Sequence, residues 1–318
     1  MTEKDRGGLP PFNGILPVDK PQDFTSFDVI AKLRGILRMK KIGHGGTLDP
    51  MATGVLPVFL GEATKLCDLL PNQDKSYTAH FRLGAVTDTQ DRTGRVLSES
   101  PLPVSREALL EVLPRFTGTI RQLPPMYSAV QVGGRRLYDL AREGVEVERT
   151  PREITVYSLE LREYEEQTRQ GVLDIRCSKG SFVRTIVHDI GQTLGCGGML
   201  TDLRRTEAAG FFLQDCLTLE QISQLVSGPE GREALARRLL PVDRAFDGLP
   251  ALRLSPRDSR LHQNGVRLTA DVRGWPPAPA VRVYDGDGRF LSLSTVTGPE
   301  EEREERRNLL IALRYFHI

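Results

Sequence analysis

The 318-residue sequence has few cysteines and histidines and no long apolar run. Its four cysteines share no C-x-x-C spacing and its five histidines are scattered, which argues against structural zinc and predicts a protein without a metal. No apolar stretch approaches the roughly 18 residues of a membrane helix. The first residues lack the apolar segment of a secretory signal, so we expect a cytoplasmic protein in a reducing compartment, with no membrane partner.

The sequence also lacks an excess of charge of one sign. Its 43 Lys and Arg against 42 Asp and Glu give a net charge of +1, which is no signature of nucleic-acid binding. Basic residues nevertheless cluster in three places: Arg34 to Lys41, Arg135-Arg136 and Arg204-Arg205. A neutral total can therefore hide one basic face, although ordinary solvated charges on helix surfaces explain the same clusters.

Local patterns predict a mixture of strands and helices. Gly14 to Val18 is typical of a short strand, and residues 77–83 alternate apolar with polar side chains, as a strand with one buried face does. Thr25 and Asp28 have the spacing of a capping box before a helix, and Thr218 and Gln221 repeat it. Residues 43–50 are too rich in glycine for a regular element and predict a fixed loop that leads into a strand.

The elements do not alternate as in a doubly wound fold, which favours an α+β domain on a mixed or antiparallel sheet. We expect a flexible leader at 1–12, a large domain at 13–245 and a small all-β domain at 246–318. An excursion from the sheet is predicted at about 123–150. The stretch Asp285 to Gly288 predicts a hairpin turn in the C-terminal domain.

Asp49 has two interpretations. An Asp before a Pro commonly caps a helix, with Pro50 in its first turn. Gly54 follows closely and leaves little helix to cap, while Gly43, Gly45 and Gly46 would let the backbone approach a flat ligand. The sequence around Asp49 thus also fits a binding loop with a carboxylate in it.

Three further residues have both a structural and a functional interpretation. His44 is either a satisfied loop histidine or a residue that stacks beside a base. Arg184, where a strand passes into a helix, is either a surface arginine or the partner of a pocket carboxylate, whose pKa it would lower by about 1–3 units against desolvation. Tyr77 is either a core residue or an aromatic face for a base, worth about 1–3 kcal/mol.

Several ordered motifs resemble the bacterial TruB family, whose members are tRNA pseudouridine synthases acting on the uridine at tRNA position 55. The resemblance covers about Gly14 to Arg205. Its most specific element is L-D-P-x-A-T-G, within His44 to Gly54. The accompanying motifs are L-P-V-D-K-P at 16–21, G-E-A-T-K at 61–65, D-K-S-Y at 74–77, R-L-G-A-V-T-D-T at 82–89, P-P-M-Y-S-A at 124–129 and C-S-K-G-S-F-V-R at 177–184.

The resemblance implies a role for individual residues. It implies that Asp49 is the nucleophile, Arg184 its ion-pair partner, and Tyr77 the aromatic that stacks on the target uracil. The implied substrate-binding residues are His44, which is associated with the flipped nucleotide, Phe182 and Leu203, which line the uracil pocket, Lys20, which supports the catalytic loop, and Asp88, near the substrate. Residues 123–150 resemble a thumb-like insertion that grips the tRNA T-loop, and the C-terminal domain resembles a PUA domain.

The sequence departs from the family pattern at two positions. Gly45 stands where the family usually has Thr, which predicts a more mobile loop with altered hydrogen bonding. Phe182 stands where Tyr is common, which removes a hydroxyl and keeps the ring.

The implied reaction breaks the N1–C1′ bond, joins C5 to C1′ and removes the C5 proton. It needs a carboxylate and a dry pocket, and no cofactor. The sequence leaves open whether Asp49 attacks C6 or C1′, and whether Tyr77 or Asp49 takes the C5 proton. The expected partner is the tRNA T-arm, bound by a monomer without a guide RNA.

Competing hypotheses remain at this stage. One is a tRNA-binding or folding module in which catalysis is incidental or lost. A guide-RNA-dependent synthase is opposed by the bacterial-looking insertion and by the lack of a lysine-rich tail. A small-molecule aspartyl hydrolase would account for Asp49 alone and leave the other motifs unexplained.

Overall fold

The computed structural model describes residues 12–70, 73–269, 280–297 and 309–316. Its largest element is a nine-stranded sheet with the order β1-β3-β12-β4-β11-β10-β7, to which β2 and β13 add at β3 and β12. The strands are β1 (Gly14–Lys20), β2 (Ile42–His44), β3 (Thr53–Leu60), β4 (Lys75–Leu83), β7 (Gly118–Gln122), β10 (Arg152–Glu165), β11 (Gln170–Cys177), β12 (Gly198–Ala208) and β13 (Phe211–Phe212). All pairs are antiparallel except β3 with β12, so the expected mixed sheet is confirmed.

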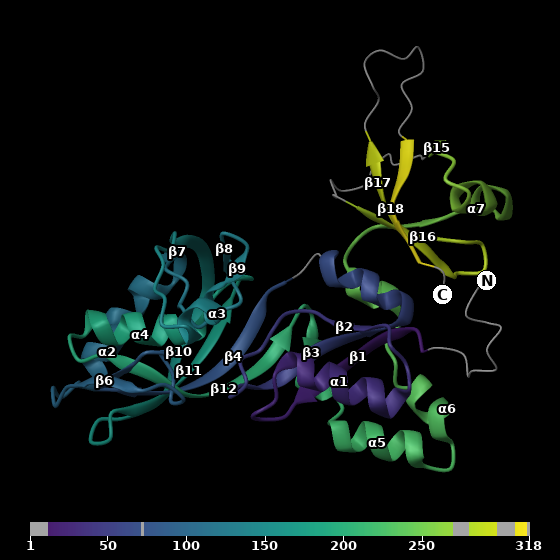
Figure 1. Cartoon of the computed structure of the whole chain (residues 1–318). Coiled ribbons are helices and arrows are strands. Elements are labelled where there is room, and N and C mark those ends of the chain that lie inside the picture. Colours follow the sequence, from purple (N-terminus) through teal and green to yellow (C-terminus); the bar gives the residue numbers. More distant parts are fainter. Residues whose placement is uncertain (1–11, 71–72, 270–279, 298–308, 317–318) are drawn as a thin grey trace.

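Apart from the last α-helix, which lies beside the C-terminal strands, the α-helices form two groups along the sheet (Figure 1). The α-helices are α1 (Ser26–Leu37), α2 (Arg106–Val112), α3 (Leu137–Arg142), α4 (Val183–Thr193), α5 (Leu219–Ser227), α6 (Gly231–Ala236) and α7 (Pro256–Gln263), and the 3-10 helices are η2 (Gly61–Asp68), η3 (Leu113–Phe116), η4 (Leu213–Asp215) and η5 (Val242–Phe246). Helix α4 packs with β4, β11 and β12 in one core, and α1 packs with β1, β3 and α5 in another. Within the described ranges, no helix is long and apolar enough to cross a membrane.

Two helix starts follow directly from local sequence. The hydroxyl of Thr25 accepts the N–H of Asp28 at 3.0 Å while the carboxylate of Asp28 accepts the N–H of Thr25 at 2.8 Å, which confirms the predicted capping box of α1. Thr218 and Gln221 form the same box at the start of α5. Each cap satisfies backbone donors that the helix itself leaves unpaired.

The C-terminal strands form a sheet of their own, in the order β14-β16-β17-β18-β15. They are β14 (Ala251–Arg253), β15 (Leu268–Thr269), β16 (Val281–Tyr284), β17 (Phe290–Thr297) and β18 (Leu309–Tyr315). The predicted hairpin turn joins β16 to β17, and α7 is a helix in a region we expected to be all β. Phe290 and Phe316 of this sheet share a core with Phe59 of β3, so the C-terminal sheet is packed onto the larger one.

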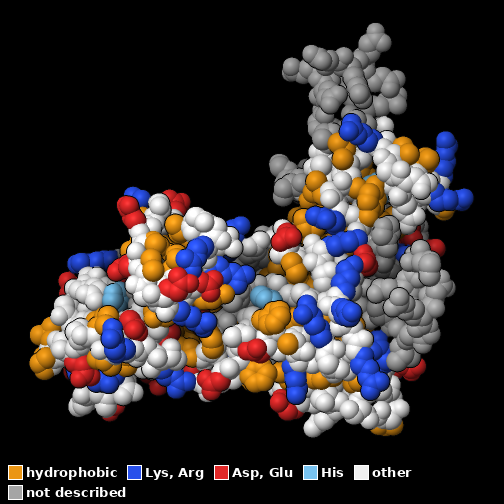
Figure 2. All heavy atoms as spheres, in the orientation of Figure 1, with side chains coloured by type: hydrophobic (Ala, Val, Ile, Leu, Met, Phe, Trp, Pro, Cys, Tyr) orange, Lys and Arg blue, Asp and Glu red, His pale blue; other side chains and the backbone are white. Residues whose placement is uncertain are grey.

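The excursion at 123–150 consists of a small hairpin and a helix. The hairpin is β8 (Gln131–Val132) with β9 (Arg135–Arg136), and α3 follows it. A second hairpin is formed by β5 (Ala85–Thr87) with β6 (Val96–Glu99). We call the part of the molecule that contains these two hairpins, α2, α3 and α4 the insertion lobe. Figure 2 shows a hollow surface between this lobe and the C-terminal sheet, with Lys and Arg side chains on both sides of it. The expected leader at 1–12 lies outside the described residues except for Phe12, which is buried.

Candidate active site

Asp49 lies in the loop between β2 and β3, and this loop is anchored in the core. The neighbouring Leu48, Met51 and Ala52 are all at most 4% exposed. The hydroxyl of Ser26 accepts the N–H of Leu48 at 2.9 Å, which ties the loop to α1. Residues 49–51 form a turn and no helix follows, so the helix-cap interpretation of Asp49 is wrong. The loop presents the carboxylate from a fixed backbone.

Arg184 is the second residue of α4 and forms an ion pair with Asp49. Its Nε lies 3.0 Å from Asp49 Oδ2, and its Nη2 donates to Asp49 Oδ1 at 3.3 Å. The guanidinium also donates to the carbonyls of Thr89 at 3.1 Å and Tyr127 at 2.9 Å. Three groups from different parts of the chain therefore fix the guanidinium, which is 4% exposed, and the guanidinium in turn orients the carboxylate.

A second carboxylate, which the sequence analysis missed, faces the same guanidinium. Asp91 is 4% exposed, and its Oδ2 lies 3.6 Å from Arg184 Nη1. Asp88, the residue that the resemblance implied, instead accepts the N–H of Arg95 at 2.9 Å. The signal was present as two acidic residues in one short segment, 88–91, but sequence spacing does not tell which of them turns inward.

The pKa of Asp49 is raised above its ordinary value. Burial is the main cause, the Arg184 guanidinium opposes it, and the Asp91 carboxylate adds to it. The Asp49 side chain still keeps 36% of its exposure, so a substrate can reach the carboxylate. We expected the ion pair to lower this pKa; burial outweighs it, because the low-dielectric surroundings disfavour the charged form.

Tyr77 lies on β4 close to Asp49 and is 7% exposed. Burial raises the pKa of its phenol to about 12, and the nearby positive charge of Arg205 opposes that rise. At neutral pH the phenol is therefore protonated. The structure places an aromatic ring and a polar hydroxyl at the edge of the carboxylate site.

Lys20, at the end of β1, is fully buried. Its Nζ donates to the carbonyls of Pro21 at 2.9 Å, Phe24 at 2.5 Å and Pro50 at 3.1 Å. Pro50 directly follows Asp49, so the ammonium ties the catalytic loop to the turn after β1. Burial lowers the pKa of Lys20 to about 8.

His44 and Gly45 lie where β2 passes into the loop, so the predicted loop begins later than expected. Burial lowers the pKa of His44, and its Nδ1 is buried without a hydrogen-bond partner. The N–H of Gly45 donates to the carbonyl of Pro57 at 2.9 Å. A Cβ on Gly45 would come within 3.1 Å of the Phe59 ring and 3.0 Å of Leu70. Glycine in place of the usual threonine therefore fits close packing at this point.

Phe182 and Leu203, which the resemblance implies as pocket residues, lie on two different parts of the fold. Phe182 caps α4, and Gln122 binds both its N–H, at 2.8 Å, and its carbonyl, at 3.0 Å. Leu203 is 5% exposed on β12, paired with Ala79 of β4. Both residues lie in elements that flank Arg184 and Tyr77.

The basic pair Arg204-Arg205, one of the three clusters that could have formed a basic face, divides into two different environments. Arg204 binds the carboxylate of Asp19 at 2.7 Å and keeps part of its exposure. Arg205 is fully buried. The expectation for Arg205 is wrong, because its guanidinium points into the protein and is inaccessible to a phosphate.

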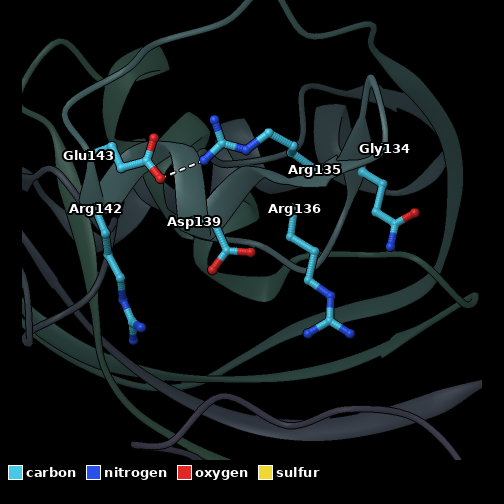
Figure 3. Close-up of a pocket in the computed structure, with 7 residues that line it drawn as sticks. Gly134, Arg135, Arg136, Asp139, Arg142 and Glu143 are labelled. Carbon is cyan, nitrogen blue, oxygen red and sulfur yellow. Dashed lines mark hydrogen bonds and ion pairs between the residues drawn. The ribbon is translucent and has the colours of Figure 1, made fainter.

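The insertion at 123–150 presents a polar pocket. The lining side chains are those of Gln131, Arg135, Arg136, Asp139, Arg142 and Glu143, together with Gly134, and Arg135 pairs with Glu143 (Figure 3). Tyr138 lies between two cations, with guanidinium carbons of Arg136 and Arg142 at 5.8 and 5.4 Å from its ring centre. Because the Tyr127 carbonyl binds Arg184, the base of this insertion is joined to the carboxylate site.

The start of β3 requires glycine at position 54. Gly54 has φ of +103°, and an added Cβ would lie 2.1 Å from the carbonyl oxygen of Arg205. We expect Gly54→Ala to lower the free energy of unfolding by about 2–4 kcal/mol, measured by denaturant titration. Gly35→Ala, in α1 with nothing within 4 Å of the added Cβ, is the matched control and should be neutral or stabilising. Equal stability of the two variants would contradict this reading of the loop.

Comparison with known proteins was made at the level of sequence and of structure. A model of the N-terminal domain of TruB family pseudouridylate synthases matches residues 34–183, and a model of the tRNA pseudouridylate synthase B C-terminal domain matches residues 184–247. The chain is 43% identical over 301 residues to tRNA pseudouridine synthase B of Stutzerimonas stutzeri, covering 94% of the chain and 95% of that protein. It is 41% identical over 293 residues to the protein of the same name from Syntrophomonas wolfei, covering 91% and 95%.

Solved structures show the same fold. A Cbf5-Nop10-Gar1 complex contains a chain that matches with a TM-score of 0.71 and 25% identity, over 95% of this chain and 84% of that one. A structure of an H/ACA RNP bound to a substrate RNA containing 2′-deoxyuridine matches with a TM-score of 0.71 and 22% identity, over 100% of this chain and 93% of that one. The predicted fold class is confirmed.

Proposed function

Because the chain belongs to the TruB family of pseudouridylate synthases, we propose that it isomerises uridine 55 in the T-loop of tRNA to pseudouridine, with Asp49 as the nucleophile. The role of Asp49 is supported above all by its ion pair with Arg184. The buried guanidinium orients a carboxylate that remains accessible. The relatives' names support tRNA as the substrate.

The reaction needs a nucleophile and no outside reagent. The N1–C1′ bond of uridine breaks, C5 bonds to C1′, the C5 proton is lost and N1 gains a proton, so atoms balance without a cofactor. Asp49 attacks one of two electrophilic carbons, C6 of the ring or C1′ of the sugar, and is released at the end. Arg184 opposes the effect of burial and so favours the anionic carboxylate, and it orients the carboxylate oxygens.

The uracil must leave the T-loop to reach Asp49. Extrusion costs a few kcal/mol, which stacking and edge hydrogen bonds in the pocket recover. We assign the stacking to Tyr77, space-filling beside the flipped nucleotide to His44, and the apolar walls to Phe182 and Leu203. Folded RNA is read largely through its shape and phosphates, so the cations along the hollow surface in Figure 2 suit the tRNA backbone.

The remaining parts of the chain suit a stand-alone enzyme. Residues 123–150 are the proposed thumb against the T-arm, and the C-terminal sheet is the proposed PUA-like RNA-binding domain within 246–318. The catalytic domain spans 13–245. The enzyme acts as a monomer in the cytoplasm, without a guide RNA, a metal or a cofactor.

The experiment uses an unmodified tRNA transcript, the purified protein and no additive. Carbodiimide treatment followed by reverse transcription should show one stop, at the position that reports pseudouridine 55, and a transcript with cytidine at 55 should show none. Stops at other uridines would overturn the proposed site. No product despite tight tRNA binding would favour a tRNA-folding module without catalysis.

A further inference from the structure

We infer that Arg205 is a positioning residue of this reaction, which fixes the loop that carries Asp49 in a single arrangement beside Tyr77. The inference rests on the proposed function for its effect on rate. The expected effect of Arg205 on the loop rests only on the contacts of its side chain.

Arg205 lies at the centre of the large sheet, between the two strands that matter for the site. On one side it pairs with Gly54 of β3, and on the other with Tyr77 of β4. Directly paired residues of neighbouring strands point to the same face, so the Arg205 and Tyr77 side chains lie together. The Arg205 backbone comes so close to Gly54 that a side chain at position 54 would clash with it.

The guanidinium of Arg205 bridges both ends of the catalytic loop. Its Nε donates to the carbonyl of Val55 at 2.7 Å, its Nη1 to that of Thr47 at 3.2 Å and its Nη2 to that of Gly46 at 3.1 Å. Two of these acceptors precede Asp49 and one follows it. A planar fork has its donors in fixed directions, so it holds the three carbonyls in one arrangement, whereas the donors of an ammonium rotate.

A fully buried cation without a carboxylate bonded to it is costly, and apolar packing would stabilise a sheet at least as well. The positive charge of Arg205 instead changes the electrostatic potential around Asp49 and Tyr77. It lowers the pKa of Asp49 and of Tyr77 against the effect of their burial, and so favours the anionic form of the nucleophile. Lys20 holds the same loop at Pro50, between the two ends that Arg205 holds.

The test compares Arg205→Met, Arg205→Lys and a control, Arg162→Met, which alters a half-exposed arginine paired with Asp174. Three quantities are measured on each folded protein: the single-turnover rate of pseudouridine formation against pH, the Kd for tRNA, and amide hydrogen exchange of the segment 42–54. Thermal unfolding gives the folded fraction, and Arg205→Lys keeps the test open if the methionine variant does not fold.

We expect Arg205→Met to lose about 100-fold in rate with less than about a threefold change in Kd, because a misplaced nucleophile costs rate more than binding. The acidic limb of its pH profile should move to higher pH, since the anion of Asp49 loses a cation. In Arg205→Lys the acidic limb should lie at the same pH as in the wild type, but only part of the rate should be restored. Segment 42–54 should exchange faster in Arg205→Met, while the control stays as in the wild type.

Three outcomes would overturn the inference: a wild-type rate in folded Arg205→Met, unchanged exchange of 42–54, or a rate loss equal to the loss of folded protein with an unmoved pH limb. If the wild type itself forms no pseudouridine while 42–54 loses protection in Arg205→Met, the proposed function has failed and the positioning of the loop stands.

Discussion

Replacing Asp49 with asparagine is expected to abolish pseudouridine formation, by about 10⁴-fold or more under single-turnover conditions. The amide has the shape of the carboxylate but does not attack carbon, and the charge that faces Arg184 disappears. Because the loop is anchored by its buried neighbours, Asp49→Asn should fold and bind tRNA as the wild type does. Product nucleosides are separated by chromatography, and tRNA binding is measured on the same preparation.

The matched control is Asp174→Asn. Asp174 lies on β11 opposite Thr78, on the other face of the strand pair from Tyr77, and binds the Thr78 hydroxyl at 2.8 Å. Its removal should leave the rate unchanged. Turnover by Asp49→Asn within tenfold of the wild type would show that another group is the nucleophile.

Replacing Arg184 with methionine is expected to reduce the rate by about 10²–10³-fold at neutral pH and to shift its pH dependence. Burial already raises the pKa of Asp49, and Arg184 opposes that rise, so removing the guanidinium raises the pKa further. The rate depends on the anion and therefore falls as pH falls through this pKa. The acidic limb should lie at higher pH in Arg184→Met, and raising the pH should recover part of the rate.

The same substitution leaves Asp49 and Asp91 without their cation, which costs about 3–5 kcal/mol of stability when a buried pair is broken. Arg184→Lys is the second variant, because it keeps the charge and gives up the paired contacts. Its acidic limb should lie between those of the wild type and Arg184→Met. Coincident pH profiles for all three proteins would contradict the proposed electrostatic role.

Features encoded locally could be predicted from the sequence. The capping boxes at Thr25 and Thr218 and the alternation along β4 depend on residues within a few positions, and the structure has them where the patterns indicate. The strand order could not be derived in this way. β12 inserts between β3 and β4, although it follows β4 by more than a hundred residues, and only long-range packing decides that placement.

The site shows the same division. The motifs pointed to Asp49 and Arg184, whose side chains are 135 positions apart in sequence and in contact in the fold. Asp91 escaped notice and Arg205 was grouped with surface cations, because each is defined by partners that no spacing reveals. Arg205 bonds to carbonyls about 150 positions away and resembled a surface arginine until its burial was known.

The most direct test of the account is tritium release from a tRNA transcript labelled at C5 of its uridines, because the reaction must expel the C5 proton of the converted base. The account predicts one equivalent of tritium released to water per tRNA by the wild type, without cofactor or guide RNA. It predicts none from Asp49→Asn and none from a transcript with cytidine at position 55. Binding of tRNA without any release by the wild type, or equal release by Asp49→Asn, would contradict it.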